Sequence, residues 1–81
     1  MTETIIIYGT SWCWSSRRAR ETFEKNKIPF QWIDIDDDEE GGKIVMGFNH
    51  GNRSVPTIVF PDGSTLVEPS DSELKSKLNI Q

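Results

Sequence analysis

The chain has 81 residues, a formal net charge of -4 and a single cysteine, which suit one small domain spanning residues 1–81. The acidic balance excludes general binding to nucleic acid or to an anionic membrane surface, because both need basic residues to replace counterions at phosphates. No apolar run approaches the roughly 20 residues that cross a bilayer, and the first residues lack the basic start of a signal peptide. One cysteine forms no internal disulfide. We therefore expect a cytoplasmic protein with no membrane partner.

The first part of the chain predicts a strand, a helix and a second strand. Residues 4–8 form a short β-branched run that is typical of a buried strand. Residues 9–12 form a loop that delivers Cys13 to the first turn of a helix, which we expect over residues 14–26. A second strand is predicted over residues 30–35. The residues expected on the sheet-facing side of the helix are Ser16, Ala19 and Phe23.

The second part predicts a helix, two strands and a last helix. The acidic stretch over residues 34–40, in which residue 35 alone is apolar, suits the positive end of a helix over residues 39–48. Strands over residues 57–60 and 65–67 flank a hairpin turn, and Ser70 with Glu73 has the spacing of a capping box that opens a helix ending near Leu78. The residues expected to pack the 39–48 helix are Ile44, Val45 and Phe48; those expected to weaken it are Gly41, Gly42 and Gly47.

This order of elements, β-α-β-α-β-β-α, predicts an α/β fold. The first two strands flank a helix and should be parallel with a right-handed connection. The last two form an antiparallel hairpin. We therefore expect a mixed four-stranded sheet with helices on both faces.

Cys13 stands where the apolar run gives way to an Arg-rich helix. At the first turn of a helix, unpaired backbone N–H groups and the helix dipole favour a negative charge. This is one way in which the pKa of a cysteine is lowered. We therefore interpret Cys13 as a candidate reactive thiolate, with an inert core cysteine as the alternative.

Three stretches at these spacings resemble the glutaredoxins of the thioredoxin superfamily. They are Tyr8-Gly9-Thr10-Ser11-Trp12-Cys13, Asn49 through Thr57 with Asn52-Arg53-Ser54-Val55-Pro56-Thr57 as its most specific part, and Asp62-Gly63-Ser64-Thr65-Leu66. The order of elements also matches, so the resemblance covers the whole chain. It is strongest for the small bacterial glutaredoxin-like proteins that include the mycoredoxins, and it implies a thioredoxin-like fold.

The resemblance implies a site for thiol–disulfide exchange. The family's nucleophile corresponds to Cys13 and attacks the disulfide that joins a small thiol to a client protein. The family's cis-proline corresponds to Pro56 and presents the backbone of Val55 to an extended thiol substrate. The resemblance also assigns Gly63, Ser64 and Thr65 to a turn that binds a carboxylate of the small thiol.

Three positions depart from the family pattern, whose Cys-x-x-Cys motif is here Cys13-Trp14-Ser15-Ser16. Ser16 occupies the place of the resolving cysteine, so a monothiol route is expected, in which a second free thiol releases the small thiol from Cys13. The Ser16 hydroxyl either hydrogen-bonds the thiolate or is a tolerated small polar group. Trp14 replaces a Pro or Gly. Many glutathione-using relatives carry a lysine at the position of Thr10, so glutathione, mycothiol and other small thiols stay open.

Further side chains are candidates for the rim of the site. Trp12 and Trp14 are both candidates for substrate contact; we expect one to be buried and Trp14 to be exposed as a docking surface. Arg53 is either a surface charge or the partner of a ligand carboxylate. No metal site is predicted, because the acidic residues 34–40 lack the spacing and glycine of a calcium loop.

We therefore predict a glutaredoxin-like monothiol oxidoreductase. It would act as a monomer on mixed disulfides between client proteins and a low-molecular-weight thiol, with no permanently bound cofactor. One alternative is a carrier in which Cys13 from each of two chains and two small thiols hold an iron–sulfur cluster. Another is a thiol-binding or docking module with little catalysis, in which Ser16 replaces the resolving cysteine, naturally or by engineering.

Overall fold

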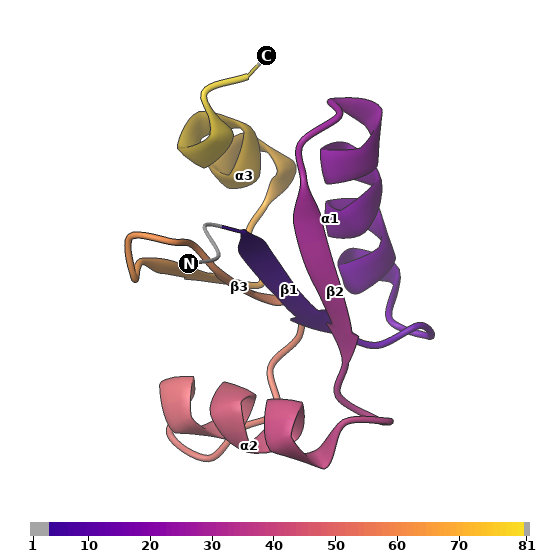
Figure 1. The fold of residues 1–81 in the computed structure, drawn as a ribbon, viewed down its shortest axis with the longest axis vertical. Helices are drawn as coiled ribbons and strands as arrows, with labels where there is room; N and C mark the ends of the chain where they lie inside the picture. The colour runs from indigo at the N-terminus through magenta and orange to yellow at the C-terminus, as the bar shows by residue number, and fades with distance from the viewer. Residues whose placement is uncertain (1–3, 81) are drawn as a thin grey trace.

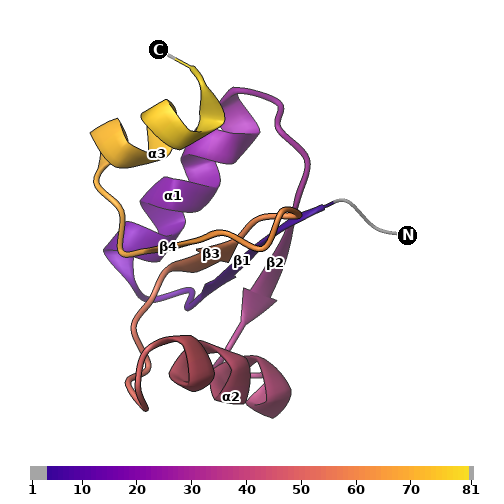
Figure 2. The ribbon, with the colours of Figure 1, turned by 90° about the vertical axis from the view of Figure 1, so that its left-hand side faces the viewer.

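The computed structural model describes residues 4–80, which form a mixed four-stranded sheet with helices on both faces (Figures 1 and 2). The strands are β1 (Ile5–Gly9), β2 (Phe30–Asp34), β3 (Thr57–Val59) and β4 (Thr65–Val67), and the helices are α1 (Trp14–Lys25), α2 (Glu39–Phe48) and α3 (Asp71–Leu78). The expected order of elements is confirmed. No helix within residues 4–80 is long and apolar enough to cross a membrane.

The sheet has the strand order β2-β1-β3-β4. β1 pairs with β2 in parallel, whereas β3 is antiparallel to both β1 and β4. Tyr8 lies beside Thr57 in this register, and Ile6 lies beside Val59. The end of β1, from which the chain runs to Cys13, therefore meets the start of β3, which directly follows Pro56.

Two apolar clusters hold the layers together, one on each face of the sheet. Figure 2 shows α1 and α3 on one side of the sheet and α2 on the other. The buried residues of the first cluster are Ile7, Ala19, Phe23, Ile58, Phe60 and Leu74. Those of the second are Tyr8, Ile35 and Val45. Ile7 and Tyr8 belong to different clusters because successive side chains of a strand point to opposite faces.

Several elements differ from their expected bounds by one residue. β1 begins and ends one residue later than expected, α1 ends at Lys25, and β2 and β3 end one residue early. Ile35 lies outside β2 but stays attached to the sheet, because its N–H donates to the carbonyl oxygen of Gly9 at 3.0 Å. Such differences are usual where helices and strands fray.

The expected packing face of α2 is wrong in two of its three residues. Val45 is buried, but Ile44 and Phe48 are exposed. Gly41 and Gly42 are buried in their place. Asp38 caps the start of the helix, and its carboxylate accepts a hydrogen bond from the N–H of Gly41 at 3.1 Å. Two of the three glycines that we expected to weaken α2, Gly41 and Gly42, are therefore part of its packing surface, whereas Gly47 is exposed.

Replacing Gly41 by alanine is expected to lower the free energy of unfolding by about 1 kcal/mol. The added Cβ would lie 2.9 Å from Cγ2 of Ile33, which must move. Gly42→Ala is the matched control, because its Cβ would meet its nearest atom at an ordinary 3.7 Å and alanine favours a helix by roughly 0.5–1 kcal/mol. Urea unfolding measures both variants. Equal stabilities would contradict a close approach at Gly41.

Candidate functional site

Cys13 lies in the loop between β1 and α1 and directly precedes the helix. Its carbonyl oxygen accepts a hydrogen bond from the N–H of Arg17 at 3.1 Å, and its own N–H donates to the carbonyl oxygen of Thr10 at 3.3 Å. The thiol is half-buried. It therefore sits at the amino end of α1, where the first backbone N–H groups have no partner inside the helix.

The hydroxyl groups of Thr10 and Ser16 are buried within hydrogen-bonding reach of the Cys13 thiolate. Thr10 is 2% exposed and Ser16 is fully buried. Neither hydroxyl oxygen has a hydrogen-bond partner among the described residues. A buried hydroxyl without a partner costs stability, whereas a thiolate on Cys13 would give both of these groups a charged acceptor.

The pKa of the Cys13 thiol is lowered from its ordinary value. Burial raises this pKa, but hydrogen bonds to the thiolate from the hydroxyl and N–H of Ser16, the N–H of Ser15 and the hydroxyl of Thr10 outweigh burial. More of the thiol is therefore ionised at neutral pH than in an ordinary cysteine, and the thiolate is the nucleophilic form.

The segment before β3 forms the opposite wall of the site. The Val55–Pro56 peptide bond is cis, as the resemblance implies. Sγ of Cys13 lies 4.0 Å from the carbonyl oxygen of Val55. Pro56 is buried, and its carbonyl oxygen accepts a hydrogen bond from the N–H of Glu68 at 2.8 Å. The fold thus brings Val55 and Pro56 to Cys13 from a distant part of the sequence.

Trp12 and Trp14 are both exposed, which corrects the expectation that one of them is buried. Their exposed fractions are 70% and 61%. Trp14 is two positions before the buried Ser16 and therefore lies on the opposite side of α1. The guanidinium of Arg18 lies 4.5 Å from the centre of the Trp14 ring. The two residues that adjoin Cys13 in the chain thus both expose large aromatic side chains.

Asp36, a residue that the sequence did not single out, joins two of the candidates. Nε1 of Trp12 donates a hydrogen bond to Oδ2 of Asp36 at 2.6 Å, and Arg53 donates to Oδ1 at 3.1 Å. Both hydrogen bonds lower the pKa of Asp36, and the bond from Trp12 has the larger effect. Arg53 thus forms an ion pair with the protein's own carboxylate. Asp36 stands among six acidic residues in the sequence, so only its contacts in the fold distinguish it.

The turn formed by Gly63, Ser64 and Thr65 lies away from Cys13, which corrects its expected role in binding the small thiol. β3 is antiparallel to β1, so the turn after β3 lies near the start of β1, whereas Cys13 follows the end of β1. Figure 2 shows this arrangement, with the segment between β4 and α3 at the opposite end of the hairpin. The N–H and hydroxyl of Ser64 also both donate to Oδ1 of Asp62, at 2.9 and 2.6 Å. These donors are therefore already occupied.

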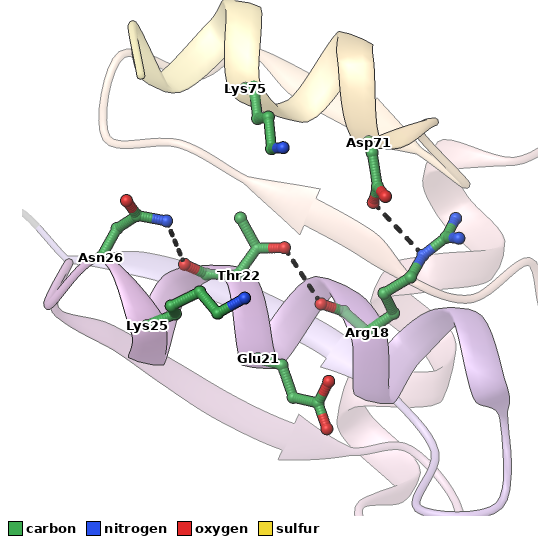
Figure 3. A pocket seen from close by; sticks show the side chains of 7 residues that line it. All are labelled: Arg18, Glu21, Thr22, Lys25, Asn26, Asp71 and Lys75. Carbon is green, nitrogen blue, oxygen red and sulfur yellow. Dashed lines mark hydrogen bonds and ion pairs between the residues drawn. The ribbon is translucent and has the colours of Figure 1, made fainter. Parts of the chain in front are cut away.

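A hollow between α1 and α3 is separate from these residues (Figure 3). Its cavity volume is about 310 Å³. Its lining consists of Arg18, Glu21, Thr22, Lys25, Asn26, Asp71 and Lys75. Arg18 connects it to the site, because its guanidinium stacks on Trp14 and its Nε pairs with Asp71 at 3.2 Å. None of the predicted site residues lines this hollow, so it supplies no part of the thiol's surroundings.

The arrangement supports nucleophilic chemistry at a single sulfur atom. Hydroxyl groups of Ser16, in α1, and of Thr10, in the loop before it, favour the thiolate, and the carbonyl oxygen of Val55 lies 4.0 Å from Sγ. The chain contains one cysteine, and Ser16 stands where a second thiol would be needed. Cys13 can therefore form a disulfide only with an external thiol.

Comparisons with known proteins agree with this geometry. The glutaredoxin family model matches residues 5–65. A protein of Mycobacterium tuberculosis strain H37Rv that bears a glutaredoxin name is 41% identical over 78 residues, which cover 96% of this chain and 93% of that protein. Mycoredoxin 1 of Corynebacterium glutamicum is 35% identical over 74 residues, which cover 91% of each chain.

Solved structures share the fold. A thioredoxin-like protein matches with a TM-score of 0.84 over 99% of this chain and 100% of that one, and its 21% identity shows the fold alone. A glutaredoxin from Archaeoglobus fulgidus is 28% identical and matches with a TM-score of 0.75 over 96% of this chain and 87% of that one. The family match over most of the sequence, together with the 41% identity to a relative over nearly its whole length, shows that this chain belongs to the glutaredoxin family of thiol–disulfide oxidoreductases.

Proposed function

We propose that this protein reduces mixed disulfides between client proteins and a low-molecular-weight thiol by a monothiol route. The observation that carries the proposal is the lone Cys13 thiol, whose pKa is lowered by Ser16, the residue at the place of a resolving cysteine. One chain supplies every group of this route, so we propose that it acts as a monomer.

The route consists of two exchange steps. The Cys13 thiolate attacks the small-thiol sulfur of the mixed disulfide, and a new S–S bond forms as the old one breaks. The client's sulfur leaves as a thiolate and takes a proton from solvent. The thiolate of a second small-thiol molecule then attacks the small-thiol sulfur on Cys13. This step releases the Cys13 thiolate together with the disulfide of the small thiol, so the two electrons that reduce the client come from two small-thiol molecules.

We propose a mycothiol-type thiol as the co-substrate. The similarity to mycoredoxin 1 supports this assignment. The neutral and buried Thr10 supports it further, because no cation stands at that position to pair with a glutathione carboxylate.

Mass spectrometry tests the route on a peptide joined by a disulfide to each candidate thiol. We expect the first adduct on Cys13 to have the mass of the small thiol, and its release to require a second thiol. The Ser16→Cys variant is the matched comparison, because a thiol at that position should release the adduct without a second thiol. A Cys13 adduct that carries the peptide, or one that free thiol does not release, would contradict the proposal.

A further inference from the structure

Three loops around Cys13 are tied together at one exposed carboxylate. Trp12 belongs to the loop between β1 and α1, Asp36 to the loop between β2 and α2, and Arg53 to the segment between α2 and β3. The carboxylate of Asp36 accepts one hydrogen bond on each oxygen, from Trp12 at 2.6 Å and from Arg53 at 3.1 Å. It therefore connects the segment that carries the thiol to the segment that leads into Val55.

The loop that carries Asp36 is itself fixed. The backbone N–H of Asp36 donates a hydrogen bond to Oδ1 of Asp34 at 2.9 Å. Arg53 also donates to the carbonyl oxygen of Ile35 at 3.2 Å, so its guanidinium holds both the backbone and the side chain of this loop. The neighbouring Asp38 serves α2 instead, since it accepts from the N–H of Gly41. Within residues 4–80, Asp36 is the acidic side chain that bonds both Trp12 and Arg53.

These contacts explain how a highly exposed indole can keep one orientation. Trp12 is 70% exposed, yet its N–H bonds a carboxylate that an arginine also holds. Hydrogen bonds to ionised groups are about twice as strong as neutral ones. A side chain that is ordered before binding loses less entropy when a substrate arrives, and aromatic side chains are suited to this use.

We propose that Asp36 is a positioning residue for the exchange reaction. Asp36 fixes Trp12 next to Cys13 and Arg53 near Val55, and so sets the width of the gap through which a disulfide approaches the thiolate. It also orients the exposed face of the Trp12 ring toward the peptide part of the substrate. The inference rests on the proposed role of Cys13 as the exchange nucleophile. Asp36 itself does not touch the reacting sulfur atoms.

The test separates recognition from nucleophilicity. The probe is an eight-residue peptide joined by a disulfide to N-acetylcysteine. Two rate constants are measured at the same pH, one for the reaction of Cys13 with this probe and one for its reaction with iodoacetamide, and the first is divided by the second. We expect Asp36→Ala to lower this ratio about fivefold, the effect of losing roughly one charge-assisted hydrogen bond. The iodoacetamide rate should stay near that of the unmodified protein. Asp37→Ala removes a neighbouring exposed carboxylate and is the matched control, with an unchanged ratio.

A double-mutant cycle identifies Trp12 as the residue through which Asp36 acts. Trp12→Phe keeps an aromatic ring but lacks the N–H, so it should lower the ratio by itself, and combining it with Asp36→Ala should cost less than the product of the two effects. An unchanged ratio in Asp36→Ala, an equal loss of both rates, or fully multiplicative effects would overturn the proposal. Because only the first exchange step is measured, a failure of thiol-dependent release would overturn the proposed function without affecting this result.

Discussion

Replacing Ser16 by alanine is expected to make the protein more stable and its thiol less reactive. The Ser16 hydroxyl is fully buried and has no hydrogen-bond partner among the described residues, so its removal should add about 1 kcal/mol to the free energy of unfolding where Cys13 is protonated. The same hydroxyl lowers the pKa of Cys13. Its loss should raise that pKa and reduce the fraction of thiolate at neutral pH.

Both effects depend on pH. A folded-state pKa below the unfolded value stabilises the fold at higher pH, and this contribution is lost as the pH falls through the folded value. The stability gain of Ser16→Ala should therefore be largest at mildly acidic pH and should shrink as Cys13 ionises. The variant's rate with iodoacetamide at neutral pH should fall roughly three- to tenfold, after allowance for solvent screening of the half-exposed thiol.

Ser15→Ala is the matched control for this prediction. Ser15 contributes its backbone N–H to the lowered pKa of Cys13, and alanine keeps that group. Its reactivity should therefore stay close to that of the unmodified protein. Equal reactivity of Ser16→Ala and Ser15→Ala would show that the Ser16 hydroxyl does not support the thiolate.

Replacing Gly9 by alanine is expected to lower the free energy of unfolding by about 2–3 kcal/mol. The added Cβ would lie 2.8 Å from Cη2 of Trp32 and 2.9 Å from both Cβ and Oγ of Ser16. The Trp32 ring can move, but Cβ of Ser16 is attached directly to the backbone of α1. The helix must therefore shift away from β1, and the Ser16 hydroxyl, which lowers the pKa of Cys13, shifts with it.

Gly47→Ala controls for the general effect of adding a methyl group. Its Cβ would meet no atom of residues 4–80 within 4 Å outside its own stretch of helix, so the variant should gain roughly 0.5–1 kcal/mol from the better helix former. Urea unfolding gives both stabilities, and alkylation of Cys13 reports the expected loss of reactivity in Gly9→Ala alone. A stable Gly9→Ala protein with normal reactivity would refute close packing of β1 on α1 at this point.

The sequence predicts the fold well because local patterns and the strand register agree. The β-branched run before Gly9, the buried side of α1 and the capping box at Ser70 all appear as expected. The packing face of α2 is the exception. Apolar periodicity favours Ile44 and Phe48, whereas the close approach of α2 to the sheet requires the absence of a side chain at Gly41, which a count of apolar residues does not reveal.

The site is predictable only where a motif fixes it. Cys13 and Val55-Pro56 meet because the motif and the topology both require it. The turn at Gly63 has suitable donors, but the direction of the hairpin carries it to the wrong end of the sheet. Asp36 could not be separated from its acidic neighbours, because its contacts with Trp12 and Arg53 depend on how three loops converge.

The pH dependence of Cys13 alkylation tests most directly whether this residue works as a stabilised thiolate. The rate with iodoacetamide should rise with pH to a plateau, and its midpoint should lie below the ordinary pKa of a cysteine, because the hydrogen bonds from Ser16, Ser15 and Thr10 outweigh burial. In Ser16→Ala the midpoint should move to higher pH. A midpoint at or above the ordinary value in the unmodified protein would contradict the account.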